Sequence, residues 1–329
     1  MTNTVLVLGA GGRLGRVLVQ SFTEAGWAVV AHSRRPPAEA PHPRVRPIHC
    51  AIDDVDALTA SASDAHVVVH ALNPVYTNWA TEVTPLARAA VQVARRLGAR
   101  LMFPGNVYNF GSGMPDVLRE DTAQRPDTRK GEIRRHVEAC LRSKAEAGVP
   151  VTVLRVGDFF GGPGTGSWFD LAVAKDLAHG KIVYPGPLDT PHAWAYLPDL
   201  GRAFVALAER QPVQPFETFH FAGHTLTGRE LTSGLIEAAT QGGLLRPDQK
   251  VKIAGLPWPL LRAGGLFVPM WAELAEMRYL WSKSHRLNGA RLAAAIGTPR
   301  HTPLVTALAE ALRALGKIDS LPAPLASAA

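Results

Sequence analysis

Short apolar runs alternate with helical patterns along the first half of the chain. The first run, Val5 to Leu8, stops at a glycine and is followed by a helical pattern that ends at Gly26. Further apolar runs occupy residues 28–31, 48–52, 66–70, 100–103 and 151–156, with helical patterns over 85–97 and 131–144. Uniformly apolar runs of this kind are typical of parallel strands buried on both faces. The alternation therefore predicts an α/β fold, a doubly wound parallel sheet with helices on both faces.

The pattern changes after Gly157. A glycine-rich loop covers residues 161–166, and short strand patterns at 182–184 and 218–221 then alternate with helical patterns at 199–209 and 228–239. We expect residues 1–160 to form the sheet domain. We expect residues 161–329 to form a smaller α/β lobe over the carboxyl edge of the sheet, with some segments returning to the sheet.

Composition excludes several classes of protein. The 329 residues are 47% hydrophobic and 19% charged, which is enough apolar material for a core and excludes disorder as the main state. Two cysteines exclude a disulfide framework. The net charge of +7 permits an anionic ligand, but the basic residues form no recognition helix, so we expect no nucleic-acid partner. The histidines show no metal-ligand spacing, so we expect no metal.

The most apolar late stretch runs over residues 253–271. Proline at 257, 259 and 269 and Arg262 interrupt it, which makes it a poor membrane-spanning helix. The N-terminal residues lead directly into the first strand and lack the pattern of a signal peptide. We therefore expect a soluble, cytoplasmic protein without a membrane partner.

A glycine motif joins the first strand to the first helix. Gly9, Gly12 and Gly15 have the spacing G-x-x-G-x-x-G. Such glycines permit a tight turn, a close approach of the backbone to a pyrophosphate and close packing of the helix, whose N-terminus favours the anion. Between a strand and a helix, this motif predicts a Rossmann-type dinucleotide site. The alternative is a glycine-rich turn without a ligand.

The residues after the second strand bear on the choice of cofactor. A protein that prefers NAD usually has a carboxylate there, which accepts from the ribose 2′-hydroxyl. This chain instead has Ser33, Arg34 and Arg35. Arginines suit a 2′-phosphate, and Arg13 in the glycine loop could add to them. We therefore expect NADP rather than NAD, against the alternative of two solvated surface arginines.

Several motifs, taken in order, resemble the extended short-chain dehydrogenase/reductase superfamily in its NAD-dependent epimerase/dehydratase branch. Beside the glycine motif, they are the segments 67–71, Val107-Tyr108, 154–161 and 196–203. The resemblance covers nearly the whole chain. It implies an NAD(P)-dependent oxidoreductase or epimerase that acts on a carbonyl or hydroxyl carbon of a small organic substrate.

The positions of that family's catalytic residues depart from its pattern. Pro104 stands where the family has Ser or Thr, and Lys130 and Arg134 stand where it has the Tyr and Lys of Tyr-x-x-x-Lys. The segment from Lys130 resembles the isoflavone-reductase-like atypical enzymes, in which the Lys is the proposed acid/base. This resemblance implies Lys130 as acid/base, with Arg134 one helical turn later holding the ribose. The alternative is a basic helix start that faces solvent. Asn106 or Asn109, which follow the fifth strand, could polarise the substrate oxygen in place of the missing Ser, or could cap a turn.

The remaining site residues follow from the position of the strand ends, which form the ligand crevice of such sheets. The cofactor-binding residues that we expect are Gly9, Gly12, Arg13, Leu14, Gly15, Ser33, Arg34, Arg35, Ile52, Ala71 and Lys130. The substrate-binding residues that we expect are Asn73, Tyr76, Tyr108, Asn109, Phe159, His192 and Trp194. Their aromatic rings favour an apolar or ring-shaped substrate, although such rings are more often part of a core.

Two other functions stay open. Without the usual Ser and Tyr, the chain could be a non-catalytic NADP(H) sensor that resembles NmrA-like redox regulators. Its overall layout also resembles a sugar-nucleotide epimerase or dehydratase. The apolar residues between 258 and 281 could be lobe core, the surface of a homodimer or a lid over an apolar substrate.

Overall fold

A computed structural model describes residues 3–35 and 42–319. Its main sheet has seven parallel strands in the order β11-β7-β5-β4-β1-β2-β3. These strands are β1 (Thr4–Leu8), β2 (Ala28–His32), β3 (Val45–Ile48), β4 (Val67–His70), β5 (Arg100–Gly105), β7 (Val151–Arg155) and β11 (Phe216–His220). The α/β fold with a doubly wound parallel sheet is thus confirmed.

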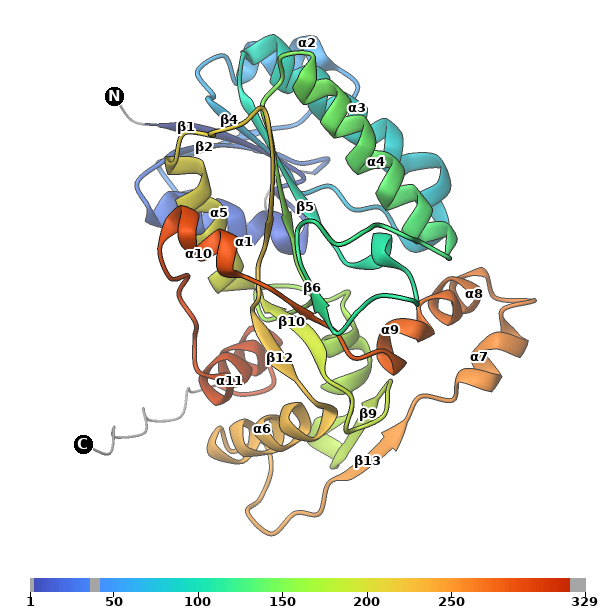
Figure 1. Ribbon diagram of the computed structural model, residues 1–329. Helices are drawn as coiled ribbons and strands as arrows, with labels where there is room; N and C mark the ends of the chain where they lie inside the picture. Colours follow the sequence, from blue (N-terminus) through green and yellow to red (C-terminus); the bar gives the residue numbers. More distant parts are fainter. Residues whose placement is uncertain (1–2, 36–41, 320–329) are drawn as a thin grey trace.

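Helices cover both faces of this sheet (Figure 1). One face packs against α2 (Val55–Ser61), α3 (Trp79–Leu97) and α4 (Arg129–Glu146). The other packs against α1 (Arg13–Glu24), α5 (Leu197–Glu209) and α10 (Ala290–Ile296). Each face has its own core of aliphatic and aromatic side chains, and burial of this apolar area drives the layers together.

The second lobe is built from small sheets and helices below the main sheet in Figure 1. Its strands are β8 (Asp158–Phe160), β9 (Lys181–Tyr184), β10 (His192–Tyr196), β12 (His224–Leu226) and β13 (Lys252–Gly255), with the pair β6 (Val117–Leu118) and β14 (Arg286–Leu287) beside them. Its helices are α6 (Gly228–Gln241), α7 (Trp258–Gly264), α8 (Pro269–Glu276), α9 (Arg278–Ser282) and α11 (Leu304–Ala314). Short helical turns lie at η1 (Tyr76–Asn78), η2 (Tyr108–Phe110), η3 (Phe169–Val173) and η4 (Leu177–His179).

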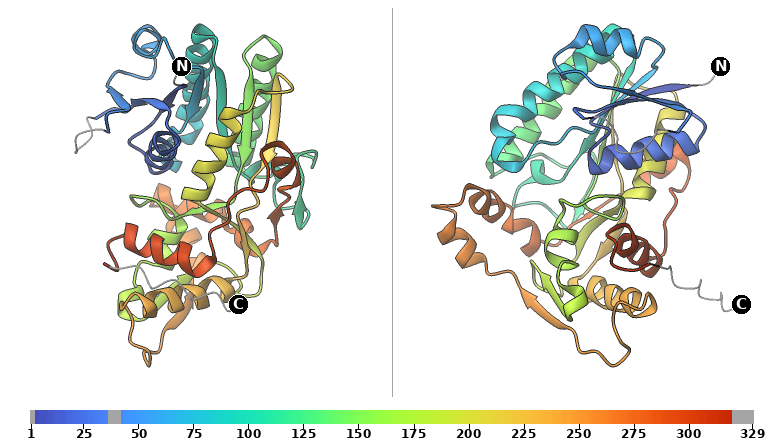
Figure 2. Two further views of the ribbon diagram at one scale, coloured as in Figure 1. Left: turned by 90° about the vertical axis from the view of Figure 1, so that its left-hand side faces the viewer. Right: turned by 180° about the vertical axis from the view of Figure 1, so that it is seen from behind.

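The third strand differs from the sequence expectation. The third strand covers Val45–Ile48, not 48–52, because Val45 pairs with Val29 and Ile48 with His32 on the neighbouring strand. A proline within this strand is tolerated since β3 lies at the edge of the sheet. Elements from beyond residue 160, namely α5, β11 and α10, complete the main sheet and its covering layer. Figure 2 shows how the chain passes repeatedly between the two parts.

Candidate cofactor and active site

The glycine loop forms a tight turn between β1 and α1. Gly9 has φ +88°, in the left-handed region that favours glycine, and a Cβ there would lie 3.0 Å from the backbone of Ala71. A Cβ on Gly15 would collide with the carbonyl oxygen of Gly9. Gly12 caps α1, whose first turn carries no acidic residue. The helix N-terminus therefore presents free N–H groups and positive partial charge at the loop.

A cavity of about 1280 Å³ begins at this loop. It extends along α1 and the carboxyl ends of β2 and β4, where Ala71, Leu72 and Asn73 line it. Of the expected cofactor residues, those that line the cavity are Gly9, Gly12, Ser33, Arg34, Arg35 and Ala71. A site at the carboxyl edge beside the glycine turn is where parallel α/β sheets bind nucleotides.

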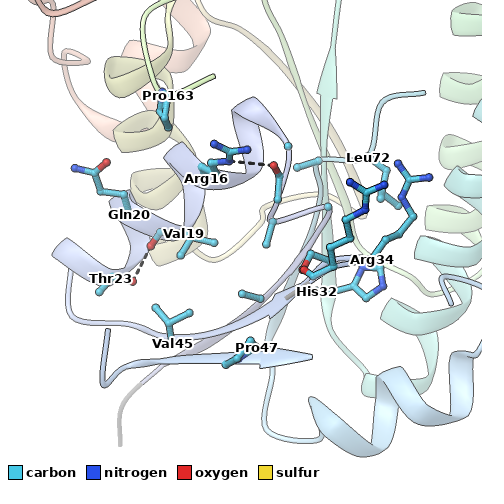
Figure 3. Close-up of a pocket in the computed structure, with 18 of the residues that line it drawn as sticks. Arg16, Val19, Gln20, Thr23, His32, Arg34, Val45, Pro47, Leu72 and Pro163 are labelled. Atoms are coloured by element: carbon cyan, nitrogen blue, oxygen red, sulfur yellow. Dashed lines mark hydrogen bonds between the residues drawn. The ribbon is translucent and has the colours of Figure 1, made fainter. Parts of the chain in front are cut away.

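Cationic side chains gather at the β2 end of the cavity. Arg34 and Arg35 follow β2 and are exposed, and Arg16 joins them from α1 while its Nε donates to the carbonyl of Gly11 at 3.0 Å. Figure 3 shows Arg16 and Arg34 reaching the cavity from these two elements. Ser33 donates to the carbonyl of Arg35 at 2.6 Å and so shapes the turn that presents both arginines. Sequence reasoning missed Arg16, although helical spacing places it one turn after Arg13.

Arg13 points away from this cavity, contrary to its expected role near phosphates. Its guanidinium donates to the carbonyl of Gly161 at 2.9 Å and forms an ion pair of 2.6 Å with Asp170, whose side chain is 1% exposed. The pair joins the start of α1 to the loop that leads into the second lobe. Arg13 therefore fixes the loop beside the cavity and is not free to bind an anion.

Three other expected cofactor residues also lie outside the cavity lining. Leu14 is buried in the core beneath α1, and Gly15 contacts the backbone of the glycine loop. Ile52 is half-buried and packs against the core on the α3 side. These residues support the shape of the loop and the sheet edge through packing.

Lys130 lies at the start of α4 and is fully buried. Its ammonium group donates to the carbonyl of Glu273 at 3.1 Å, to the carboxylate of Glu273 and to the carboxylate of Glu276 at 2.5 Å. An ammonium has three donors, and all three are used. Two carboxylates hold the ammonium group in ion pairs, so this arrangement does not support the acid/base role that the resemblance implied.

Arg134 is likewise enclosed rather than open to a ribose. Its guanidinium lies 4.8 Å from the ring centre of Trp79 and 5.5 Å from that of Phe103. One N–H faces the carbonyl of Pro104 at 3.4 Å, and Nε has no hydrogen-bond partner among the described residues. Burial lowers the pKa of Arg134. The side chain therefore stabilises the packing of α3, α4 and β5 through cation–π contacts.

Two tyrosines from neighbouring strand ends meet near this point. The hydroxyls of Tyr76 and Tyr108 lie 2.9 Å apart, and the ring of Tyr76 faces Lys130. Burial raises the pKa of Tyr76 to about 12 and that of Tyr108 well above its usual value, and the Asp158 carboxylate adds to both shifts. The two phenols therefore keep their protons at neutral pH.

The asparagines after β5 have different surroundings. The side-chain oxygen of Asn106 accepts from the backbone N–H of Tyr108 at 3.1 Å and so caps the turn. Asn109 is fully buried, and within residues 3–35 and 42–319 neither of its amide atoms has a partner. An unpaired buried amide is costly, which marks Asn109 as a group that a ligand or water could satisfy.

Asp158 and His192 form a pair between the two parts of the molecule. Asp158 begins β8 directly after the main-sheet strand β7, and its carboxylate lies 2.8 Å from Nε2 of His192 on β10. The carboxylate side chain is 16% exposed, whereas that of His192 is 2% exposed. His192 is one of the expected substrate-binding residues, and Asp158 follows the strand predicted over 151–156, so its position at a strand end already pointed to the same crevice.

Aromatic rings enclose His192. The ring of Trp281 stacks on it at 4.3 Å between ring centres, and Trp194 lies at 5.2 Å. The indole N–H groups of both tryptophans are buried without a partner in the described part of the chain. Phe159, another expected substrate residue, is half-buried against the core of the main sheet.

Comparison with known proteins identifies the family. The model of the NAD-dependent epimerase/dehydratase family matches residues 5–220. The chain belongs to this family. No curated protein matches the chain by sequence.

Solved structures of this family have the same fold. A putative epimerase from Burkholderia cenocepacia is 19% identical with a TM-score of 0.73, and the match covers 95% of this chain and 98% of that one. The enzyme WbmH from Bordetella bronchiseptica, in complex with NAD⁺, is 17% identical with a TM-score of 0.74 and coverage of 96% and 99%. A UDP-glucuronic acid 4-epimerase from Bacillus cereus, in complex with UDP-glucuronic acid and NAD, is 15% identical with a TM-score of 0.71 and coverage of 95% and 99%.

Proposed function

We propose that this chain is an NADP(H)-dependent oxidoreductase or epimerase-type enzyme that acts on a carbonyl or hydroxyl carbon of a small organic substrate. The observation that carries the proposal is the cavity that starts at the glycine loop and ends at Arg34 and Arg35. Family membership supports a nicotinamide dinucleotide, and the arginines support the phosphorylated form.

The residues around the loop fit a dinucleotide. A Cβ on Gly12 would meet little except the carbonyl oxygen of Gly9 at 3.3 Å, so the missing side chain leaves room for a pyrophosphate at the start of α1. A bound dinucleotide would supply the hydride acceptor or donor for the substrate carbon. Gly9, Gly12 and the N-terminus of α1 would bind the pyrophosphate, and Ala71 would pack beside it.

The residues after β2 favour a 2′-phosphate over a free 2′-hydroxyl. The segment from His32 to Arg35 contains no carboxylate, and among the described residues neither Arg34 nor Arg35 has an ion-pair partner. Charge-assisted hydrogen bonds between guanidinium and phosphate are about twice as strong as neutral ones. Arg16 lies on the same cavity and would add positive potential.

Titration of the purified protein with NADPH and NADH tests this assignment. We expect tighter binding of NADPH, and the double change Arg34→Ala with Arg35→Ala should reduce that preference by about 10-fold or more, since each charged contact is worth about 1.5–3 kcal/mol. Arg96→Ala is the matched control, because Arg96 is a half-exposed arginine on α3 away from the cavity. Tighter binding of NADH by the unchanged protein would refute the 2′-phosphate assignment.

Asp158 is the group that we propose for proton transfer. A hydroxyl that loses hydride from its carbon must also lose its proton, and the reverse reaction needs a proton donor. Lys130 has no free donor, and the raised pKa values of Tyr76 and Tyr108 keep both phenols protonated. Asp158 is partly exposed beside both tyrosines and is hydrogen-bonded to a second proton-carrying group, His192.

A non-catalytic NADP(H)-binding sensor is the second candidate. The enclosed positions of Lys130 and Arg134 favour it, because neither residue is available to take over the chemistry of the missing Tyr and Lys. A sensor would bind NADPH without transferring hydride to any member of a carbonyl and alcohol panel. UDP-sugars belong in that panel, since relatives were solved with UDP-glucose or UDP-glucuronic acid.

A further inference from the structure

An apolar projection stands off the second lobe where α7 turns into α8. Leu266 is 83% exposed and Phe267 is 86% exposed, and Leu260 on α7 is 59% exposed. We call the residues 260–268 the apolar tip. Both Figure 1 and Figure 2 show α7, α8 and their connection projecting from the body of the molecule. Large apolar side chains on a soluble surface are normally scattered, so their clustering at one projection indicates a contact surface.

The helices beneath the tip are firmly anchored. Trp258 at the start of α7 is buried and donates to the carbonyl of Pro185 at 2.7 Å. The ring of Trp271 fills the space beside Gly264 so closely that a Cβ there would collide with it. Glu273 and Glu276 attach α8 to Lys130. The exposed side chains are therefore presented by an ordered helical pair.

The charge of this segment is one-sided. No Asp or Glu occurs from Gln249 to Ala272, whereas Lys250, Lys252 and Arg262 do. The first carboxylate after the segment, Glu273, is already paired with Lys130 and Arg129. Lys252 begins β13 and Lys250 precedes it, at the end of that strand away from the tip, so the cation of the tip itself is the exposed Arg262. Exposed apolar side chains beside an exposed cation are a combination that binds the interface of an anionic membrane.

We propose that the apolar tip docks this protein onto an anionic lipid surface, with Leu266 and Phe267 inserted at the headgroup boundary and Arg262 facing the headgroups. A second copy of the chain fits less well. A standard interface buries ~800 Å² per partner, whereas a Phe side chain offers only ~150–250 Å² and the tip is narrow.

This contact is peripheral. None of the helices within residues 3–35 and 42–319 has the length and apolar character needed to span a bilayer. The proposal therefore departs from our sequence expectation of no membrane partner, which rested on the prolines that interrupt this same stretch. Those prolines stand at the starts of α7 and α8, and Pro269 begins α8 directly after the exposed turn.

Co-sedimentation of the full chain with vesicles tests the proposal. We expect binding to phosphatidylcholine vesicles that contain phosphatidylglycerol and ~5-fold weaker binding to pure phosphatidylcholine, since one basic residue near the surface is worth about 1 kcal/mol. Leu266→Ser with Phe267→Ser should weaken binding by ~100-fold or more, from the lost apolar burial. Val213→Ser is the matched control, since Val213 is 83% exposed but lies between α5 and β11. It should bind as the unchanged protein does.

Sedimentation velocity without lipid tests whether a second copy of the chain, rather than a lipid surface, binds the tip. Failure of the unchanged protein to bind anionic vesicles overturns the proposal, and so does binding that survives the double change at the tip. Self-association that the double change abolishes, in a protein that does not bind vesicles, assigns the tip to a second copy instead. Equal binding to neutral and anionic vesicles overturns the proposed preference of the tip for anionic lipid.

Discussion

At the scale of single residues, the surroundings of His192 decide what the pair with Asp158 can do. Nδ1 faces the carbonyl of Leu280 at 3.3 Å, and Nε2 faces the Asp158 carboxylate at 2.8 Å. An imidazole with acceptors at both nitrogens satisfies both only when both carry protons. The pair can therefore hold a proton behind a carboxylate that is itself partly exposed.

Replacing Asp158 tests the proton-transfer role. Asp158→Asn keeps the shape of the side chain but removes its basicity, so we expect turnover to fall by about 10²–10⁴-fold while NADPH binding stays unchanged. Steady-state kinetics on whichever carbonyl or alcohol of the panel is turned over, together with NADPH titration, provide the measurement. Asp189→Asn is the control, because Asp189 is an exposed carboxylate of the same lobe, paired with Arg229.

His192 would act through Asp158 as a positioning residue. His192→Gln should therefore change the pH profile of turnover as well as its rate, whereas a purely structural role would lower the rate at every pH by the same factor. Wild-type turnover in Asp158→Asn would exclude Asp158 from the chemistry and leave the cofactor assignment intact.

At the scale of elements, local pattern predicted the glycine loop, the succession of strands along the first half of the chain and five helices, those that correspond to α1, α3, α4, α5 and α6. These features depend on residues that are close in sequence. The surroundings of Lys130, in contrast, depend on residues that are distant in sequence. Its carboxylate partners come from α8, which follows more than a hundred residues later. Spacing within α4 correctly places Lys130 and Arg134 one turn apart but cannot show which element covers them.

The contact between α4 and α8 gives a stability prediction. Lys130→Met would leave Glu273 and Glu276 without their buried cation, and removing one partner of a buried pair typically costs about 3–5 kcal/mol. We expect the free energy of unfolding, measured with urea, to fall by that order. Arg135→Met is the control, since Arg135 lies on the same helix in a half-exposed pair with Glu132.

Neutralising the carboxylates provides the complementary variant. Lys130→Met combined with Glu273→Gln and Glu276→Gln should recover much of the loss, because no carboxylate is then left without the buried cation. A Lys130→Met protein as stable as the unchanged one would mean that α8 does not depend on this contact.

At the scale of the whole molecule, the two parts are interleaved along the chain. The strand pattern changes near residue 160, and the elements that return to the main sheet from beyond it are α5, β11 and α10. The pattern over 218–221 already showed a strand, yet its partner β7 is not adjacent in sequence, so pairing could not be assigned. The Arg13–Asp170 ion pair joins the two parts again beside the cavity.

Buried histidines in both parts link this architecture to pH. Burial, the largest cause in each case, lowers the pKa values of His70 and His224 to about 4 and those of His220 and His285 to about 3. Nearby cations add to the effect, with Arg134 beside His70 and Arg155 beside His220. The folded state therefore favours neutral imidazoles at all four positions.

These shifts predict that acid weakens the fold before its carboxylates titrate. Unfolded histidines bind protons near pH 6.5, so the stability from the four neutral rings is complete above that pH and is lost as the pH falls toward 4 and then 3. Each ring contributes a slope of up to ~1.4 kcal/mol per pH unit. Thermal unfolding followed by circular dichroism should show a lower midpoint at pH 5 than at pH 7.5. His70→Leu should reduce that difference, since neither ring nitrogen of His70 has a partner within the described residues. An unchanged midpoint between these pH values would contradict the burial of neutral rings.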